Sequence, residues 1–173
     1  MTRPRVLVLA FSTLRSDARV LRQITLLSSE YDVSTVGYGT SPPGVIEHLR
    51  IPDELVAWHK RRGWLIARCY QRAYDSAPVI RFLRSRLCAE RWDAIVANDV
   101  ETVPLALTLN AGGVHADLHE YATRQNEQSW RWRWFVAPYN AWIVRRWVTC
   151  ADSVSTVGEE LAKEYWREFG IEA

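Results

Sequence analysis

Short apolar runs alternate with amphipathic segments along the chain, and this alternation limits the folds that the chain can adopt. The first run, residues 6–11, has no polar alternation, which is typical of a strand covered on both faces by helices. Apolar residues at helical spacing follow within residues 15–29, where Ser16 or Asp17 is placed to cap the helix. This order predicts the opening strand and helix of a doubly wound sheet.

The same alternation continues to the end of the chain. Further strands are predicted at residues 33–38, 45–51, 93–97, 113–116 and 153–157. Helices are predicted at residues 54–91 with a break near Ala77 and Pro78, and at 102–109, 132–149 and 159–169, the last one capped by Gly170. Parallel strands joined by helices form a mainly parallel sheet with right-handed crossovers. The prediction is an α/β fold, a Rossmann-like three-layer sandwich, in a single domain over residues 1–173.

Charge and cysteine content argue against several classes of protein. Basic and acidic residues nearly balance, 22 against 20, so the overall charge does not indicate nucleic acid as a partner. The cysteines Cys69, Cys88 and Cys150 are odd in number and far apart, which argues against a disulfide framework and against a zinc knuckle. No segment approaches the roughly 20 apolar residues of a membrane span. We therefore expect a cytoplasmic protein.

Ionisable and polar residues stand where the predicted strands end. Asp117, His119 and Glu120 follow one strand, and Asp99 and Thr156 lie at the ends of two others. In open α/β sheets, ligands bind beyond the carboxyl ends of the strands. We therefore expect these residues at one site, with an imidazole that can bond to hydroxyls or assist a proton transfer. The alternatives are a histidine satisfied by local backbone and, for Asp117, a cap on the following turn.

The loop after the first strand is a second candidate for ligand binding. It carries Ser12, Thr13, Arg15 and Asp17 in front of a helix whose N-terminal amides suit an anion. The alternative is an ordinary strand-to-helix turn, with Asp17 as the helix cap and Arg19 as a surface residue.

A shared metal ion is not expected at His115 and His119. On a helix the two imidazoles would lie on one face and suit a metal. On a strand they would lie about 13 Å apart, too far to share an ion. The short apolar run after Gly112 and Gly113 favours a strand, so no metal site is predicted.

A basic and aromatic stretch from Trp58 to Arg91 is the other unusual feature. Residues 54–91 contain nine lysines or arginines and three acids, interleaved with aromatic and aliphatic residues, and a similar mixture recurs from Trp130 to Phe135. Such a pattern suits an amphipathic surface on anionic lipid at the inner face of a membrane. The alternative is that the apolar side chains pack in the core while the arginines cover the surface. Binding of nucleic acid by the same stretch is less favoured, because no recognition motif accompanies it.

Four segments in this order resemble the N-terminal domain of GT-B glycosyltransferases of the family 4 type. They read VLVLA with SDARV after it, then DAIVAND, DLHE and ADSVSTVGEEL. The resemblance implies the N-terminal, acceptor-side half of a GT-B fold, with the donor-binding domain absent from this chain. It places the histidine of the third segment at the cleft near the transferred sugar, which assigns a catalytic role to His119.

The activity that the resemblance implies is retaining, metal-independent transfer of a sugar from a nucleotide-diphosphate sugar to a sugar or lipid-linked acceptor. No cofactor is expected, and the donor would be bound mainly by the missing domain, so the isolated domain would be inactive or nearly so. The expected substrate-binding residues are Ser12, Thr13, Arg15, Asp17, Asp99, Asp117, Glu120 and Thr156. The rival interpretation is a non-catalytic Rossmann-like module that binds a small ligand or another protein.

Overall fold

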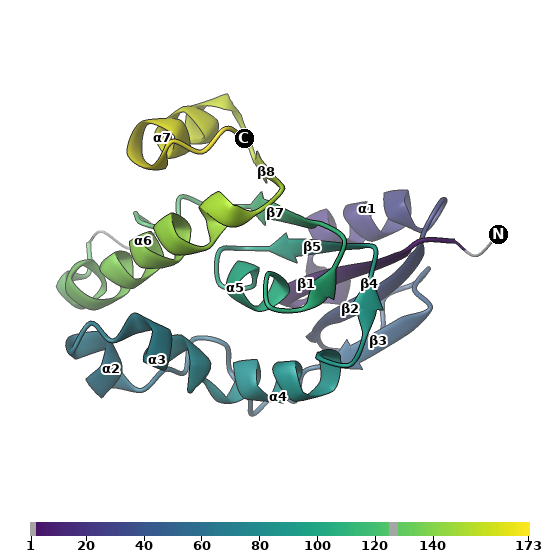
Figure 1. The fold of residues 1–173 in the computed structure, drawn as a ribbon, viewed down its shortest axis with the longest axis horizontal. Coiled ribbons are helices and arrows are strands. Elements are labelled where there is room, and N and C mark those ends of the chain that lie inside the picture. The colour runs from purple at the N-terminus through teal and green to yellow at the C-terminus, as the bar shows by residue number, and fades with distance from the viewer. Residues whose placement is uncertain (1–2, 125–127) are drawn as a thin grey trace.

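The computed structural model describes residues 3–124 and 128–173, which fold around a six-stranded parallel sheet (Figure 1). The strand order is β3-β2-β1-β5-β7-β8, and all neighbouring strands run parallel. The strands of this sheet are β1 (Arg5–Thr13), β2 (Asp32–Tyr38), β3 (Glu47–Arg50), β5 (Ala94–Asn98), β7 (Val114–Leu118) and β8 (Ser153–Thr156). The predicted Rossmann-like α/β fold is confirmed.

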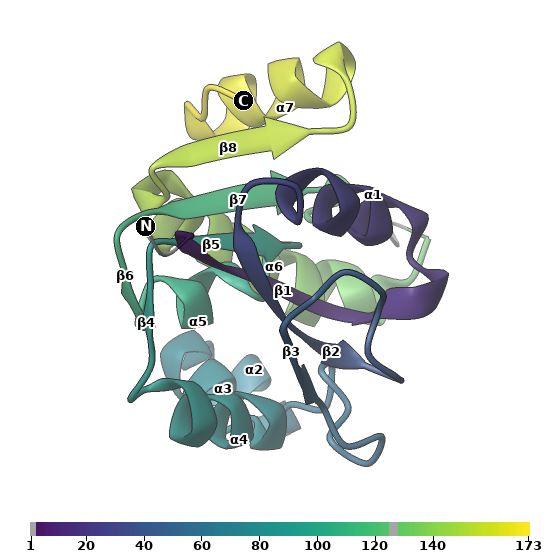
Figure 2. The ribbon, with the colours of Figure 1, turned by 90° about the vertical axis from the view of Figure 1, so that its right-hand side faces the viewer.

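Helices cover both faces of the sheet, so the chain has the predicted three layers (Figure 2). The helix α1 (Ala18–Leu27) packs on one face, and a larger group covers the other. The remaining α-helices are α2 (Arg62–Ile66), α3 (Tyr70–Asp75), α4 (Pro78–Leu87), α5 (Val103–Ala106), α6 (Ala137–Arg146) and α7 (Glu159–Phe169). No helix within the described residues is long and apolar enough to cross a membrane.

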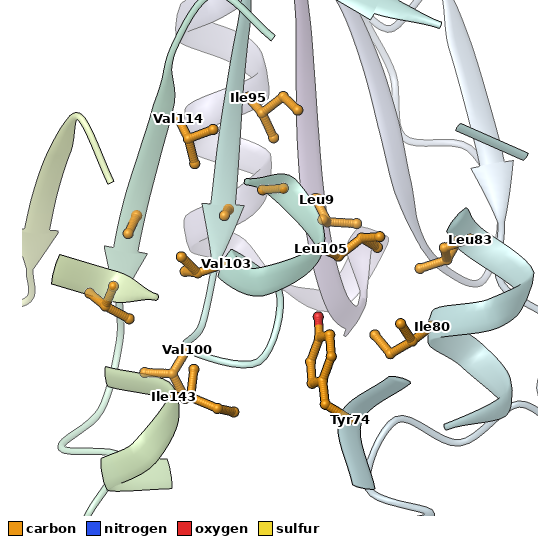
Figure 3. Close-up of a cluster of buried hydrophobic side chains, with 14 of the residues drawn as sticks. Leu9, Tyr74, Ile80, Leu83, Ile95, Val100, Val103, Leu105, Val114 and Ile143 are labelled. Atoms are coloured by element: carbon orange, nitrogen blue, oxygen red, sulfur yellow. The ribbon is translucent and has the colours of Figure 1, made fainter. Parts of the chain in front are cut away.

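The central strand β1 shows why its sequence is apolar without alternation. Leu7 and Leu9 belong to the large core beneath α3 to α6, whereas Val8 and Ala10 belong to the smaller core beneath α1. Successive side chains of a strand point to opposite faces. Figure 3 shows the larger core, to which Leu9 and Ile95 from the sheet and side chains of α4 and α5 belong.

The region from residue 54 to 91 departs from the single broken helix that the sequence predicts. The break at Ala77 is confirmed, because Pro78 begins α4 and Ala77 is extended at φ −61° and ψ 128°. Residues 54–61 are not helical, which corrects the predicted start. A second break separates α2 from α3, where Arg68 adopts the left-handed φ of 54°.

Smaller corrections concern helix ends and short elements. The helix predicted at residues 15–29 is α1, and a 3-10 turn, η1 (Leu14–Ser16), precedes it. The helix predicted at residues 132–149 is α6, which lies between the π-helix η2 (Trp132–Val136) and the 3-10 turn η3 (Val148–Cys150). Pro138 in the first turn of α6 lacks the N–H of an α-helical bond, and a π-helix precedes it. The strand at residues 45–51 and the helix at 102–109 are shorter than predicted. The two-stranded pair β4 (Arg91–Trp92) and β6 (Asn110–Ala111) was not predicted.

Candidate functional site

A cleft with a volume of about 660 Å³ opens beyond the carboxyl ends of β1, β5 and β7. Several candidate residues line it, and two tryptophans contribute to its walls. The polar and aromatic lining residues are Phe11, Asp17, Trp58, Asp99, Glu101, His119, Glu120, Trp132 and Asn140. The structure therefore brings together four of the predicted site residues, namely Asp17, Asp99, His119 and Glu120.

Asp117 lies beneath this cleft and joins three elements of the fold. Its residue is 2% exposed, and it stands beside Asn98 of β5 and Ser155 of β8 in the sheet. The carboxylate accepts hydrogen bonds from Arg19 Nε at 2.9 Å and from Ser155 Oγ at 2.7 Å, and also from Arg19 Nη2 and from Gln23. Its bonds thus go to protein groups, and its predicted contact with a substrate stays a prediction.

Two oxygen atoms lie near Nε2 of the His119 imidazole, and one of them is within hydrogen-bond distance. Its Nε2 lies 3.1 Å from Asn98 Oδ1 and 3.6 Å from Asp117 Oδ2. Both oxygens accept hydrogen bonds, so we assign the ring proton to Nε2. The side chain is 18% exposed and lines the cleft. In the neutral ring, Nδ1 is therefore the atom with a lone pair for a bound ligand.

His115 contacts two serines of β8 and not the residues that contact His119. Its Nδ1 lies 2.8 Å from Ser153 Oγ and its Nε2 lies 3.0 Å from Ser155 Oγ. The predicted strand is confirmed, because His115 lies within β7 and His119 follows its last residue. Within residues 3–124 and 128–173, no cluster of three or more His, Cys, Asp or Glu is placed to hold a metal ion.

Asp99 occupies a tight turn directly after β5. Its φ is 70°, in the left-handed region that Asp tolerates better than most residues, and its N–H donates to the Asp117 carbonyl at 3.0 Å. Burial raises the pKa of its carboxyl, and the nearby carboxylates of Glu120, Asp17 and Glu101 raise it further, while His119 lowers it. Negative charge is therefore concentrated at this wall of the cleft.

The loop before α1 is organised by Asp17. Asp17 Oδ1 accepts from the Val20 N–H at 3.2 Å, so Asp17 is the predicted N-cap, and its Oδ2 accepts from Ser12 Oγ at 2.7 Å. A carboxylate thus already occupies part of the helix N-terminus that was predicted to bind an anion. Thr13 and Arg15 are exposed beside it.

Some predicted site residues do not line the cleft. Its described lining does not include Ser12, Thr13, Arg15, Asp117 or Thr156. Thr156 Oγ1 instead donates to the Gly158 carbonyl at 3.3 Å. Their predicted roles in binding a substrate stay predictions.

Sequence reasoning missed Arg19 and the pair formed by Lys60 and Glu101. Arg19 was given a surface position as the alternative, yet it forms a bidentate ion pair with Asp117. Lys60 Nζ lies 2.7 Å from Glu101 Oε1 and 3.1 Å from the Ala57 carbonyl, with 6% of its side chain exposed. The only sequence signal was the helical spacing of Arg19 and Gln23; nothing local marks the other pair.

Tyr165 of α7 fixes the segment that follows β7. Its hydroxyl donates to the Glu120 carbonyl at 3.0 Å and accepts from the Ala122 N–H at 3.3 Å. Burial is the largest cause that raises the Tyr165 pKa to about 12. Asn140 of α6 adds a bond from Nδ2 to the Ala122 carbonyl at 2.6 Å. The cleft wall beside His119 is thus held by two helices.

Comparisons with known proteins show the fold of the chain. No model of a protein family and no curated protein matches the sequence. A sucrose-phosphate synthase from Thermosynechococcus elongatus has a similar structure, with a TM-score of 0.60 and 10% identity over 99% of this chain and 46% of that one. Arabidopsis thaliana UGT89C1 complexed with UDP gives a TM-score of 0.45 and 14% identity over 96% of this chain and 49% of that one.

The similarity to the sucrose-phosphate synthase shows a fold of the Rossmann-like kind found in GT-B glycosyltransferases. The chain spans less than half the length of either protein.

Proposed function

We propose that this chain is the acceptor-side domain of a retaining, metal-independent glycosyltransferase of the family 4 type that uses a nucleotide-diphosphate sugar. The observation that carries the proposal is His119, whose imidazole is hydrogen-bonded to Asn98 at the wall of the cleft. The GT-B type of fold supports the same class of reaction.

The lining of the cleft suits a sugar. Carboxylates of Asp99 and Glu101 accept hydrogen bonds from hydroxyl groups, and the indoles of Trp58 and Trp132 offer apolar faces for the C–H groups of a sugar ring. His119 Nδ1 accepts a hydrogen bond from a hydroxyl of the bound sugar and orients it. Positioning of this kind supplies much of the rate enhancement when two substrates must meet.

A second domain would complete the site. The half-length match to the sucrose-phosphate synthase supports this view. In the proposed reaction, the acceptor hydroxyl forms a bond to the anomeric carbon on the face from which the nucleoside diphosphate leaves, and the departing diphosphate takes the hydroxyl proton. Thr13 and Arg15, exposed before α1, face the leaving diphosphate from this domain, and the second domain holds the rest of the donor. The chain by itself is then inactive or nearly so.

The experiment uses the complete reading frame from which this chain comes, with release of nucleoside diphosphate as the readout. We expect His119→Ala to reduce kcat by about 100-fold or more, the usual size for a group that acts on the reacting hydroxyl. Thermal unfolding should change little. Chelation with EDTA should leave the rate unchanged.

The matched control is His48→Ala, because His48 bonds to Thr35 and Gly39 at the far edge of the sheet. Equal losses in the two variants would show that His119 has only a structural role. If the reading frame encodes no second domain and no nucleotide sugar is consumed, the non-catalytic binding module becomes the better description.

A further inference from the structure

One end of the molecule exposes large apolar side chains that the proposed reaction does not use. Ile66 at the end of α2 is 64% exposed, Trp134 of η2 is 65% exposed and Trp130 just before η2 is 57% exposed. Figure 1 shows α2 and the beginning of α6, which follows η2, at the same end of the fold, and α2 contacts η2. Burying such side chains against another apolar phase is favourable.

A basic groove of about 470 Å³ lies beside these side chains, between the α2–α3 turn and α6. Arg68, Arg145 and Arg146 line it together with the rings of Tyr70 and Trp142, and its described lining contains no carboxylate. Glu168 approaches Arg145 only at 4.0 Å. The groove is therefore complementary to an anion that carries or adjoins apolar groups.

The backbone presents Arg68 to this groove at a conformational cost. Its φ of 54° lies in the left-handed region, which arginine rarely adopts. This turn ends α2, and Arg68 follows the exposed Ile66 by two residues, so an apolar side chain and a guanidinium belong to the same exposed turn. Strain of this kind gathers at binding sites.

We propose that this end of the molecule, formed by Ile66, Trp130, Trp134 and the groove of Arg68, Arg145 and Arg146, docks on an anionic lipid bilayer. Tryptophan rings favour the headgroup level, arginines attract anionic headgroups, and an exposed isoleucine reaches the acyl chains. A nucleic acid would use the arginines and indoles, but it would leave Ile66 in water. We define these residues as the docking surface.

The docking surface is narrower than the stretch from Trp58 to Arg91 that the sequence suggests. Ile80, Leu83 and Leu87 of α4 are buried in the core, so this helix has no apolar face to offer a membrane. The structure instead joins the exposed end of α2 to η2 and α6, which lie far away in the sequence. Trp132 of η2 lines the cleft, so the same short helix contributes one residue to the cleft and Trp134 to the docking surface.

Binding to vesicles tests the inference without any sugar transfer, so failure of one proposal does not decide the other. The chain is sedimented with vesicles of phosphatidylglycerol and phosphatidylcholine in equal parts, and with phosphatidylcholine alone. We expect binding to the anionic vesicles only, weakened as NaCl rises from about 0.05 M to about 0.5 M because salt screens the attraction.

Two sets of variants separate the basic and apolar contributions. Each arginine near an anionic leaflet strengthens binding by about fivefold, so Arg68→Gln/Arg145→Gln/Arg146→Gln should weaken it by about 100-fold. Trp130→Ser/Trp134→Ser should weaken it by about tenfold or more, since each indole loses its apolar contact. All these side chains are solvent-exposed, so circular dichroism and thermal unfolding should match the wild type.

Matched controls change the same residue types elsewhere on the surface. Arg22→Gln/Arg81→Gln/Arg91→Gln removes equal charge from exposed positions of other elements, and Trp166→Ser removes an indole that is 61% exposed on α7. The controls should bind within about twofold of the wild type. No binding at low salt, or equal losses in the controls, would overturn the proposal. Tighter binding to single-stranded RNA than to vesicles, lost in the same variants, would replace the bilayer with a nucleic acid.

Discussion

The ion pair between Arg19 and Asp117 offers a sharp test of what holds the site together. Asp117→Ala removes a carboxylate whose side chain is 3% exposed and leaves an arginine whose side chain is 26% exposed. Removing one partner of a buried pair costs about 3–5 kcal/mol because the other charge stays behind without compensation. Arg19 keeps some contact with water, so we expect the lower end, about 3 kcal/mol.

Two contributions set this magnitude. The bonds from Ser155 and Gln23 to the carboxylate are lost together with the ion pair. Arg19 Nη1 is already buried without a hydrogen-bond partner among the described residues, so the guanidinium has no second acceptor ready. In a chain of this length, a loss of about 3 kcal/mol lowers the midpoint of thermal unfolding by about 9 °C.

The assay is urea unfolding followed by circular dichroism, with Asp53→Ala as the control. Asp53 pairs with Arg50 at 2.6 Å on the surface, where the two side chains are 70% and 55% exposed, respectively. An exposed pair of this kind contributes less than about 1 kcal/mol. Equal losses in Asp117→Ala and Asp53→Ala would refute the reasoning. The double variant Arg19→Met/Asp117→Leu should recover most of the loss, because no charge is left buried.

Three further predictions concern neighbouring residues. Burial raises the pKa of Asp99 above its ordinary 3.8, so the stability that this raised pKa contributes is full below pH 3.8 and is lost as the pH rises through the pKa of the folded state. Asp99→Asn should therefore raise the free energy of unfolding at pH 7 relative to the wild type. This gain should vanish in urea titrations below pH 3.8. Tyr165→Phe leaves the Ala122 N–H without its partner and should cost about 1–3 kcal/mol, with faster amide exchange at that residue by NMR. A Cβ at residue 37 would lie 2.6 Å from the Leu14 side chain, so Gly37→Ala should cost about 1–3 kcal/mol in the same urea assay, and an unchanged midpoint would show that this contact relaxes freely.

The sequence predicts most of the sheet because local and global signals agree there. The apolar run of β1 fits burial on both faces, and α7 has the predicted bounds because Gly170 takes the left-handed C-cap position, at φ 69°. The helical spacing between residues 54 and 61 was misleading, because Lys60 is used in an ion pair with Glu101 rather than on a helix face. Tertiary contacts outweigh intrinsic helix propensity in such segments.

The sequence predicts where the candidate site lies, but not the contacts that hold its residues in place. Strand ends identify His119 and Asp99 as neighbours, since parallel strands deliver their carboxyl ends to one edge. The partner of Asp117 lies 98 positions away in the chain, and no periodicity signals a contact over that distance. The contact of Asn98 with His119 was not predicted either, because a polar residue at the end of a strand indicates only the start of a turn.

The two hydrogen bonds between Tyr165 and the segment after β7 have a consequence for the order in which the site forms. A chain leaves the ribosome from its N-terminus, and the elements that it carries begin to fold in that order. The residues that line the cleft are synthesised before α7, and the hydroxyl that bonds to Glu120 and Ala122 follows them. The cleft wall therefore lacks these two hydrogen bonds until α7 has been synthesised, and a nascent chain stalled before α7 would hold His119 beside a segment without them.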